Sequence, residues 1–471
     1  PELLWLVLAF KRGGEMVLAI PAPGGSPGVA ALLVNPAGVH PSDAESLVAL
    51  SGASGDGDLY THLRWREALW RDTLTRRFYR DLEQAVRALG AGARGVATED
   101  VRQSLALRCV SRLLFLAFLE AKGWLDGDRA FLSRQVAARG GDLHRTLLEP
   151  LFFGTLNAPM ARRAAAARAF GRLPFLNGGL FTRDSLEKRH RALRFADHDI
   201  AHVVGNLLAR YRVTAHEESA EFSEAAVDPE MLGRAFESLM ASDDRRITGA
   251  FYTPSAMIHR ITDAALDAAF HDPAAHAALD EARSGRVADA EAASRLRLAL
   301  GDLRILDPAC GTGAFLVHAL VEISRLLLAA HDERPEHARR RAVLARSIFG
   351  VDINPTAVWL CELRLWLSVV VDSPERDPLC VPPLPNLDRH VRCADALAGP
   401  AFDVSAGHDA GVTRLRERYA RATGPRKQSL QRALDRSERQ LAALALEARI
   451  TVSVARRRDL VCALRGRDLF G

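Results

Sequence analysis

The spacing of apolar residues changes character along the chain. Residues 1–55 alternate short apolar runs, such as LLWLVLAF and GVAALLV, with turns rich in glycine, proline and serine, which predicts a small β-rich N-terminal module. From 56 to 225 apolar residues recur every three or four positions, as in VRQSLALRCVSRLLFLAFLEAKGWL. This period is typical of amphipathic helices, so we expect an α-helical domain there.

From about residue 300 short apolar strands precede long helices. The strand LRIL leads through DPACGTG into AFLVHALVEISRLLLAA, and RSIFGV leads through DINP into TAVWLCELRLWLSVV, while RHVRCADAL suggests a third strand. This alternation predicts an α/β fold with a parallel, doubly wound sheet, which we place in a domain at 226–404. The tail at 405–471 is charged and helical, with too few apolar residues for a core of its own, so we expect it to pack weakly or project.

Composition narrows the class of protein. With 48% hydrophobic and 26% charged residues, the 471-residue chain has the profile of a soluble globular protein of several domains. Its apolar start is too short to span a membrane and lacks the basic region of a signal peptide. Six scattered cysteines, without a CxxC pair or a Cys/His cluster at zinc-ligand spacing, predict a reducing cytoplasmic location and no metal site. The net charge of +5 permits a polyanionic partner without demanding one.

The segment DPACGTGAF, residues 307–315, follows the first strand of the α/β pattern. Gly311 and Gly313 allow a sharp turn at the strand end and let a ligand approach main-chain N–H groups at the start of the next helix. Such a crevice suits a nucleotide-like cofactor. The third glycine of the dinucleotide fingerprint is replaced by Leu316, which disfavours a pyrophosphate cradle.

The second strand ends in GVDINP, residues 350–355. Asn354 can cap the next helix, and Pro355 suits its first turn. An acidic side chain at the end of this strand is placed to accept hydrogen bonds from both hydroxyls of an adenosine ribose, and Asp352 is our candidate. A carboxylate at a strand end is as often a solvated cap, so both interpretations stand for Asp352 taken alone.

Together these segments resemble the gamma-class N6-adenine DNA methyltransferases, in particular the large single-chain restriction–modification methylases. The resemblance extends over most of the chain and rests on DPACGTGAF, on GAFYTP at 249–254, on DPEMLGRAFESLM at 228–240, and on SRLLFLAFLEAKGWL and PFLNGGLF in the helical domain. It implies a Rossmann-like S-adenosylmethionine-dependent methyltransferase sheet preceded by the α-helical domain and the small β-rich N-terminal module.

The resemblance also implies roles for individual residues. The Thr253–Pro254 turn would hold the methionine carboxylate, and Ile353 would pack on the adenine ring of the cofactor. Asp395 would accept a hydrogen bond from the exocyclic amine of that adenine. Ordinary core packing explains Ile353 equally well, and residues such as Phe251 and Phe315 more often serve packing than chemistry. The implied cofactor-binding residues are Phe251, Tyr252, Thr253, Pro254, Asp307, Pro308, Ala309, Gly311, Gly313, Phe315, Asp352, Ile353 and Asp395.

The catalytic tetrapeptide of that family, Asn/Asp-Pro-Pro-Tyr/Phe, does not occur in the sequence. Its Asn side chain and Pro carbonyl accept from the target amine, while its aromatic ring stacks on the flipped base. Because residue 1 is Pro rather than Met and the motif is missing, we expect a fragment of an adenine-N6 methyltransferase of a restriction–modification or phage-defence system. It would act on double-stranded DNA, contain no catalytic residue itself, and need a C-terminal part or partner subunit for the motif and target recognition.

Other functions remain open from the sequence. The chain can instead be a non-catalytic subunit that binds S-adenosylmethionine or DNA, and methylation of RNA or protein is a weaker alternative. Glu120-Ala121-Lys122 matches half of a restriction-nuclease site, but its helical spacing disfavours a nuclease. The basic runs at 188–191, with Arg194, and at 339–341 suit contacts to DNA phosphates, although such runs are more often solvated faces.

Overall fold

A computed structural model describes most of the chain, and all structural statements here concern the part that it describes. That part comprises residues 7–10, 16–21, 29–36, 39–51, 65, 69, 71–96, 98–177, 179–211, 213, 222–224, 227, 231–232, 253, 255–370, 373–397 and 410–465.

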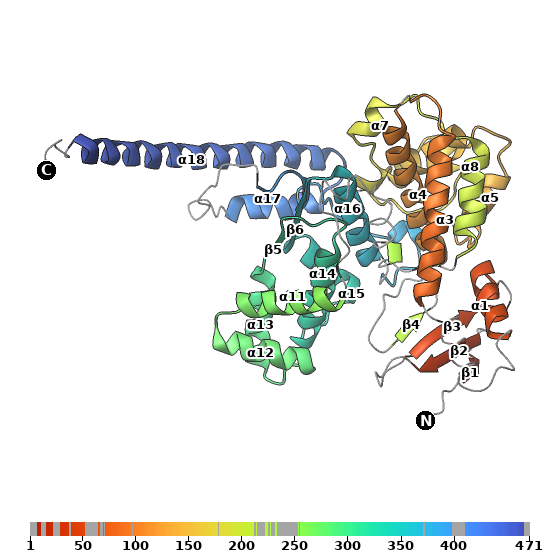
Figure 1. Ribbon diagram of the computed structural model, residues 1–471, viewed down its shortest axis with the longest axis horizontal. Coiled ribbons are helices and arrows are strands. Elements are labelled where there is room, and N and C mark those ends of the chain that lie inside the picture. The colour runs from red at the N-terminus through yellow and green to blue at the C-terminus, as the bar shows by residue number, and fades with distance from the viewer. Residues whose placement is uncertain are drawn as a thin grey trace.

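A four-stranded sheet forms the N-terminal module (Figure 1). Its strands are β1 (Val7–Phe10), β2 (Met16–Pro21), β3 (Val29–Val34) and β4 (Phe222–Glu224). The first three strands are antiparallel neighbours, and β4 pairs parallel to β3. Alternate residues of β2 and β3 are buried together with Leu50 of helix α1 (Pro41–Ser51), as the period of two requires. The last strand of this sheet therefore comes from outside the predicted range 1–55.

The described residues between β3 and β4 are mostly helical. Its α-helices are α3 (Arg71–Ala91), α4 (Glu99–Ala121), α5 (Phe131–Ala137), α6 (Ala165–Arg168), α7 (Ser185–Arg189) and α8 (Asp197–His202). Tighter or wider helical turns join them: η1 (His144–Leu148), η2 (Pro150–Leu156), η3 (Met160–Arg162), η4 (Gly179–Phe181) and η5 (Val203–Leu208).

A three-stranded parallel sheet follows, in the order β5-β6-β7. The strands are β5 (Ile305–Asp307), β6 (Ile348–Asp352) and β7 (Val391–Cys393). Asp307 pairs with Gly350, and Asp352 pairs with Cys393, so the loops that leave the three strands begin at one edge of the sheet. The surrounding helices are α11 (Ser255–Ala269), α12 (Pro273–Ser284), α13 (Ala290–Asp302), α14 (Ala314–Ala329), α15 (Glu336–Leu344), α16 (Pro355–Val370) and η6 (Pro378–Cys380). The described chain is thus a mostly helical α/β protein with small sheets.

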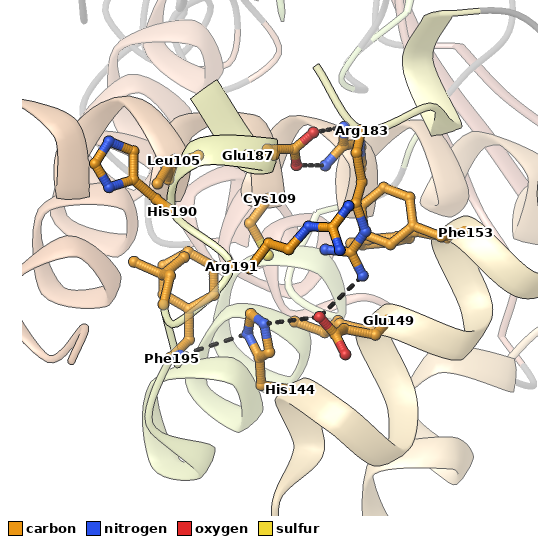
Figure 2. A pocket seen from close by; sticks show the side chains of 14 residues that line it. Leu105, Cys109, His144, Glu149, Phe153, Arg183, Glu187, His190, Arg191 and Phe195 are labelled. Carbon is orange, nitrogen blue, oxygen red and sulfur yellow. Dashed lines mark hydrogen bonds and ion pairs between the residues drawn. The ribbon is translucent and has the colours of Figure 1, made fainter. Parts of the chain in front are cut away.

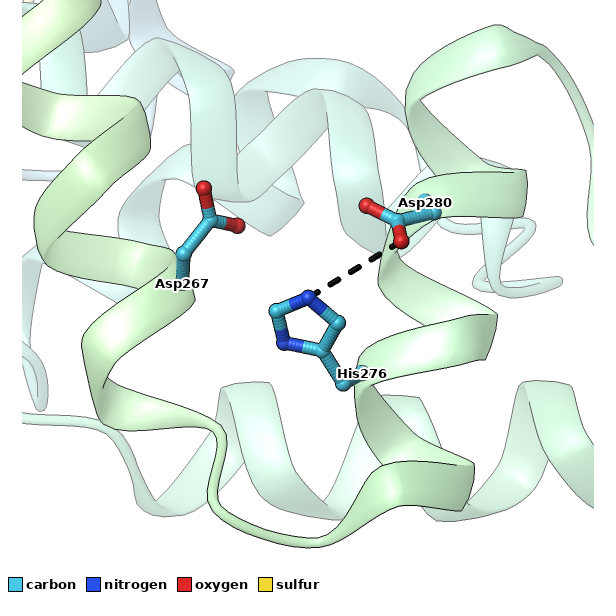
Figure 3. Close-up of side chains that lie close together, drawn as sticks. All are labelled: Asp267, His276 and Asp280. Carbon is cyan, nitrogen blue, oxygen red and sulfur yellow. Dashed lines mark ion pairs between the residues drawn. The ribbon is translucent and has the colours of Figure 1, made fainter.

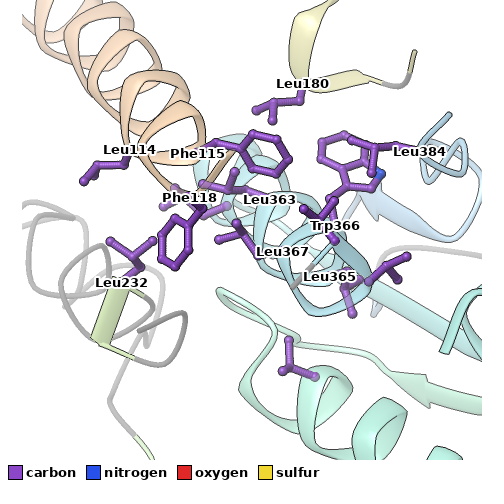
Figure 4. Packing of buried hydrophobic residues seen from close by; sticks show 14 of the residues in the cluster. Leu114, Phe115, Phe118, Leu180, Leu232, Leu363, Leu365, Trp366, Leu367 and Leu384 are labelled. Carbon is purple, nitrogen blue, oxygen red and sulfur yellow. The ribbon is translucent and has the colours of Figure 1, made fainter. Parts of the chain in front are cut away.

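Two central helices join the helical region to the sheet region. Every residue of α4 from Leu105 to Leu119 is buried, and so is every residue of α16 from Ala357 to Val370. A helix that is apolar on all sides belongs in a protein core rather than at its surface. Phe115 of α4 packs beside Trp366 of α16 (Figure 4), in one continuous cluster of buried side chains. Each buried side chain of this kind contributes roughly 1.5–3 kcal/mol, so the two regions stabilise each other.

The tail consists of α17 (Ala410–Ala420) and the long helix α18 (Gly424–Arg465), whose far end projects from the body (Figure 1). The expectation that the tail lacks a core of its own is wrong for its first part. Val412, Tyr419 and Leu434 are buried in a small cluster between α17 and α18. Beyond this cluster, α18 exposes apolar residues such as Ile450 and Val454, as expected for a projecting segment.

Asparagines connect the tail to both other regions. Asn177, in the PFLNGGLF segment, adopts a left-handed conformation with φ of 52° and donates to the side-chain oxygen of Asn386 over 3.3 Å. Asn386 in turn donates to the carbonyls of Tyr419 and Ala422, each over 2.8 Å. Because these buried amides are hydrogen-bonded to three different regions, they hold those regions in register.

No described helix combines the length and the apolar character needed to cross a membrane. Cys109, Cys310, Cys361, Cys380 and Cys393 are free thiols.

Candidate cofactor site at the strand ends

The loop after β5 turns through two glycines before α14 begins. Gly311 and Gly313 have φ values of 52° and 86°, in the left-handed region that glycine adopts without steric cost. The N–H of Gly313 donates to the carbonyl of Cys310 over 2.8 Å, and α14 starts at the next residue. The carboxylate of Asp307 accepts from the N–H of Ala309 over 3.1 Å. The sharp turn predicted at the end of this strand is therefore present.

The two glycines serve different purposes. A Cβ atom at Gly313 would lie 2.5 Å from the sulfur of Cys361, a buried residue of α16. A Cβ atom at Gly311 would meet nothing within 4 Å. Gly313 thus allows α16 to pack closely against the loop, whereas Gly311 leaves open space in front of the backbone.

Asp352, at the end of β6, links the first two loops. Its carboxylate accepts from the N–H of Gly311 and from the N–H of Asn354, each over 2.8 Å. Asn354 accepts from the N–H groups of Thr356 and Ala357 over 2.8 and 3.3 Å, so the predicted helix cap is confirmed. Asp352 is therefore more than a solvated cap, because it bridges two loops 41 residues apart.

The third loop lies beside the second. The N–H of Ala394 donates to the carbonyl of Asp352 over 3.0 Å, and the exposed Asp395 accepts from the N–H of Leu397 over 2.9 Å. The side chain of Ile353 is 56% exposed, which excludes the alternative that it is an ordinary core residue. An apolar side chain exposed between two acidic strand ends is available to a ligand.

A cavity of about 410 Å³ adjoins the outer side of β5. Asp307, Pro308 and Phe315 line it from the glycine loop and α14, while Ile261 and Thr262 line it from α11. Burial, and then the neighbouring charge of Asp352, raise the pKa of Asp307 above its ordinary value. Raised carboxyl pKa values beside a cavity are common at ligand sites.

The structure brings most of the predicted residues together. Asp307, Pro308, Ala309, Gly311, Gly313, Phe315, Asp352, Ile353 and Asp395 all follow the carboxyl ends of β5, β6 and β7. Thr253 lies just ahead of α11, the helix that borders the cavity. Phe251, Tyr252 and Pro254 lie outside the described residues, as does most of the DPEMLGRAFESLM segment.

Sequence reasoning did not single out Arg364. This residue of α16 is only 5% exposed and donates to the carbonyl and the hydroxyl of the buried Thr312, over 3.2 and 3.1 Å. The guanidinium thereby holds the middle of the glycine loop against α16. The signal was available, since a single arginine in the apolar run WLCELRLWL needs a buried partner.

The weaker sequence signals have structural explanations. Glu120 lies in the last turn of α4, not in a strand, and accepts from the N–H of Leu132 at the start of α5 over 2.8 Å. Burial raises its pKa to about 7. The ammonium group of Lys122 lies 5.3 Å from the ring centre of Trp124. Glu120 thus joins the end of α4 to the start of α5, and Lys122 lies over a ring two residues away, so neither residue lies in the strand that a nuclease motif needs.

The basic run at 339–341 is neither a solvated face nor a DNA contact, and both interpretations were wrong. Arg339 and Arg340 are 5% and 7% exposed and donate to the carbonyls of Ser324 and Ser368. Arg341 donates to the carbonyl of Pro383, and burial lowers its pKa to about 10. The guanidinium groups on α15 therefore connect this helix by hydrogen bonds to α14, to α16 and to the proline-rich loop.

A group of three potential metal ligands lies on α11 and α12. Asp267, His276 and Asp280 each offer one potential ligand atom, and these three atoms lie within 4.8 Å of one another (Figure 3). A guanidinium nitrogen of Arg283 lies 2.5 Å from a carboxylate oxygen of Asp267 and 3.6 Å from one of Asp280. Because this cation already neutralises the group, we assign no metal to it.

The sequence matches one protein-family model, described as MmeI, DNA-methyltransferase domain, over residues 283–376. That stretch contains β5, β6, the glycine loop and Asp352. A solved structure of the type IIL restriction–modification enzyme MmeI in complex with DNA superposes with a TM-score of 0.46 at 21% identity, covering 69% of this chain and 40% of that one.

Curated relatives are similar over longer or shorter stretches. A putative type II restriction enzyme and methyltransferase of Methanocaldococcus jannaschii is 29% identical over 331 residues, which are 63% of this chain and 28% of the relative. The adenine-specific methyltransferase PglX of Streptomyces coelicolor is 38% identical over 72 residues, 15% of this chain and 6% of that protein. DNA methyltransferase A of Bacillus subtilis is 23% identical over 233 residues, 48% of this chain and 24% of that protein.

The chain therefore spans less than a third of the length of each of these curated relatives. The family match nevertheless falls on the two strand–loop–helix units that hold Gly311 and Asp352. The resemblance to the large restriction–modification methylases that the motifs predict is confirmed on this ground.

Proposed function

We propose that this chain binds S-adenosylmethionine at the ends of β5, β6 and β7, in a Rossmann-like sheet, and forms part of an adenine-N6 methyltransferase acting on double-stranded DNA. The observation that carries the proposal is the hydrogen bond from Gly311 to Asp352, with open space in front of Gly311. It couples a close backbone approach to an acidic group at the next strand end, which is the arrangement that a nucleoside cofactor needs.

The residues present fit such a cofactor. A carboxylate has about four acceptor positions, and backbone N–H groups use two of those of Asp352, so capacity remains for ribose hydroxyls. The exposed side chain of Ile353 offers an apolar surface for an adenine ring, and Asp395 offers an acceptor for its amine. When bound, S-adenosylmethionine supplies a methyl group on a sulfonium centre.

The contribution of this chain to methyl transfer is binding and orientation. Attack by an exocyclic amine needs a flipped base held with its lone pair toward the methyl group. No Asn/Asp-Pro-Pro-Tyr/Phe tetrapeptide occurs in the sequence to hold that base. The proposed chain therefore binds the cofactor but does not methylate DNA by itself, and another segment or subunit supplies the tetrapeptide.

Isothermal titration with S-adenosylmethionine tests the cofactor part. The wild-type chain and an Asp302→Ala control should bind equally, because Asp302 is an exposed residue paired with Arg346. Asp352→Ala should weaken binding at least roughly tenfold, since one charge-assisted hydrogen bond is worth about 1.5–3 kcal/mol. Absence of binding by the wild type refutes this part. Tritium transfer to DNA by the isolated chain refutes the claim that it cannot methylate alone.

The alternative is a non-catalytic subunit that binds S-adenosylmethionine or DNA. The intact mass of the native protein from its source, read together with the gene beyond codon 471, discriminates the two. A larger product that contains the tetrapeptide supports a methyltransferase. The subunit is supported if the native product has this length and if no partner from the same locus that carries the tetrapeptide gives it DNA-methylating activity.

A further inference from the structure

A narrow pocket lies in the helical region, far along the chain from the strand ends. It is bounded by α4, by η1 and η2, and by α7 with the turn that follows it (Figure 2). Its volume of about 40 Å³ is a few times that needed for one water molecule. The pocket is therefore too small for a nucleoside, but it accommodates the oxygen atoms of one oxyanion.

The charged side chains in this pocket differ in how they are paired. Arg112, which is 2% exposed, makes a bidentate pair with Glu187, one contact being 2.9 Å. Arg183 donates to Glu149 over 3.0 Å, and its guanidinium lies 4.1 Å from the ring centre of Phe153. In the described part of the chain, no acid or carbonyl pairs with the guanidinium of Arg191. One cation in the pocket thus lacks a counter-ion.

The turn that carries Arg191 is held in place. Arg94 and Arg194 exchange two backbone hydrogen bonds of 2.8 and 2.9 Å. The side chain of Arg194 donates to the carbonyl of Arg191 over 3.0 Å and to that of Leu193 over 2.6 Å. Arg194, a residue of the predicted DNA-contacting run, is therefore used within the protein. Its role is to fix the turn, so Arg191 is presented to the pocket from a rigid support.

Helix α7 is fixed in the same way. Asp184 and Glu187 form a reciprocal capping box at its start, and Arg112 holds Glu187 from the core. Lys188 and Arg189, in its last turn, are exposed. Lys188 and Arg189 consequently lie on a rigid surface beside the pocket that Arg191 lines.

We propose that Arg191 and Arg183 bind one backbone phosphate of double-stranded DNA in this pocket, which we call the phosphate notch. Figure 2 shows both guanidinium groups inside the pocket, above Glu149. A planar guanidinium matches the oxygens of a phosphodiester. Glu149 pairs with Arg183 in the free protein, and the phosphate replaces that carboxylate. Lys188 and Arg189 face the neighbouring phosphates.

His144 completes the notch as a neutral group. Its ring lies 5.4 Å from that of Phe195, and burial lowers its pKa to about 4, so it carries no charge at neutral pH. Arg183 and Arg191 supply the positive charge that the phosphate meets inside the notch. Binding should therefore weaken as the salt concentration rises.

The notch rests on the proposed function, because it assigns duplex DNA as the partner. To test it, binding of a DNA duplex by the full chain is measured by fluorescence anisotropy at several salt concentrations. Arg191→Ala should weaken binding roughly tenfold and reduce the slope of log affinity against log salt by about one. Glu149→Gln should strengthen binding, because it frees Arg183. Opposite effects from two residues of one pocket cannot arise from misfolding.

Arg295→Ala is the matched control, since Arg295 pairs with Glu291 on the surface of α13. It removes the same charge and should leave the slope unchanged. Equal slopes for wild type and Arg191→Ala, or absence of duplex binding by the wild type, overturn the notch. Titration of S-adenosylmethionine into the same preparations keeps the two proposals apart, because the notch variants should bind the cofactor as the wild type does.

Discussion

The carboxylate of Asp352 accepts a hydrogen bond from the backbone N–H of Gly311 over 2.8 Å, across 41 residues of sequence. This contact joins the ends of two neighbouring parallel strands. It places an acidic group beside a stretch of backbone that has open space in front of it. The candidate cofactor site is therefore organised before any ligand arrives, which reduces the ordering cost of binding.

Replacing Asp352 by Asn should test how far this contact stabilises the fold. The amide retains the size of the side chain but lacks the charge that strengthens both hydrogen bonds. We expect the free energy of unfolding to fall by about 1–2 kcal/mol, measured by urea denaturation. Asp302→Asn, at an exposed position, should change it by less than about 0.5 kcal/mol. Equal values for the two variants would contradict a stabilising role for Asp352.

The glycine loop permits a sharper comparison. Gly311→Ala should cost roughly 1–2 kcal/mol for its left-handed backbone alone, because the new Cβ meets nothing within 4 Å. Gly313→Ala should cost roughly 2–5 kcal/mol, since its Cβ would lie 2.5 Å from the sulfur of Cys361. Denaturant midpoints measure both values.

Cys361→Ala supplies the control for this comparison, because it removes the sulfur that the new Cβ would meet. It should recover part of the loss in the Gly313→Ala background and none in the Gly311→Ala background. An equal effect in both backgrounds would show that the clash is not the cause.

The buried pair of Arg112 and Glu187 predicts a dependence of stability on acid. Burial opposes ionisation of Glu187, but the charge and hydrogen bonds of Arg112 outweigh it, and the pKa of Glu187 lies below its ordinary value. Its contribution to stability is therefore complete above the ordinary carboxyl pKa of about 4.5 and is lost as the pH falls through the lower folded value. Melting temperatures between pH 3 and 7 should fall at the acid end.

Glu187→Gln leaves Arg112 without its counter-ion and should cost roughly 3–5 kcal/mol at pH 7. The loss should shrink toward acid pH, where the wild-type carboxylate is protonated as well. A constant difference between the variant and the wild type from pH 7 to 3 would refute the ionic pair. Glu291→Gln, which alters an exposed pair with Arg295, serves as control.

Glu362 predicts the opposite dependence. This residue of α16 is 8% exposed, and burial, followed by the charge of Asp388, raises its pKa to about 8, while Lys427 acts against them. The folded protein therefore keeps Glu362 protonated after the unfolded chain has ionised it. Stability should fall as the pH rises from about 4.5 to about 8.

Glu362→Gln replaces the acid by a neutral group of the same shape. It should raise the free energy of unfolding at pH 8, on the order of 1–3 kcal/mol, and have little effect at pH 5. Urea denaturation at the two pH values measures the difference. Destabilisation at pH 8 would mean that the carboxylate is ionised and paired in the folded protein.

Local features of the site could be predicted from the sequence. Glycines with positive φ in DPACGTG and the asparagine cap in DINP follow from backbone sterics and from short-range hydrogen bonds. Apolar residues at every third or fourth position likewise identified α4, and the alternation of short strands with long helices identified α16. These properties depend on residues close together in the chain, so the sequence by itself determines them.

Only the tertiary structure decided which distant groups meet. The run Arg339–Arg341 is charged like Lys188 and Arg189. Its guanidinium groups nevertheless donate hydrogen bonds to backbone carbonyls in the interior, whereas Lys188 and Arg189 are exposed. Ile353 is exposed although its sequence permits a core position, and Arg194 supports the turn that presents Arg191. A side chain's own chemistry states what partner it needs, but its position in the packed chain determines which partner it receives, because that depends on residues tens to hundreds of positions away.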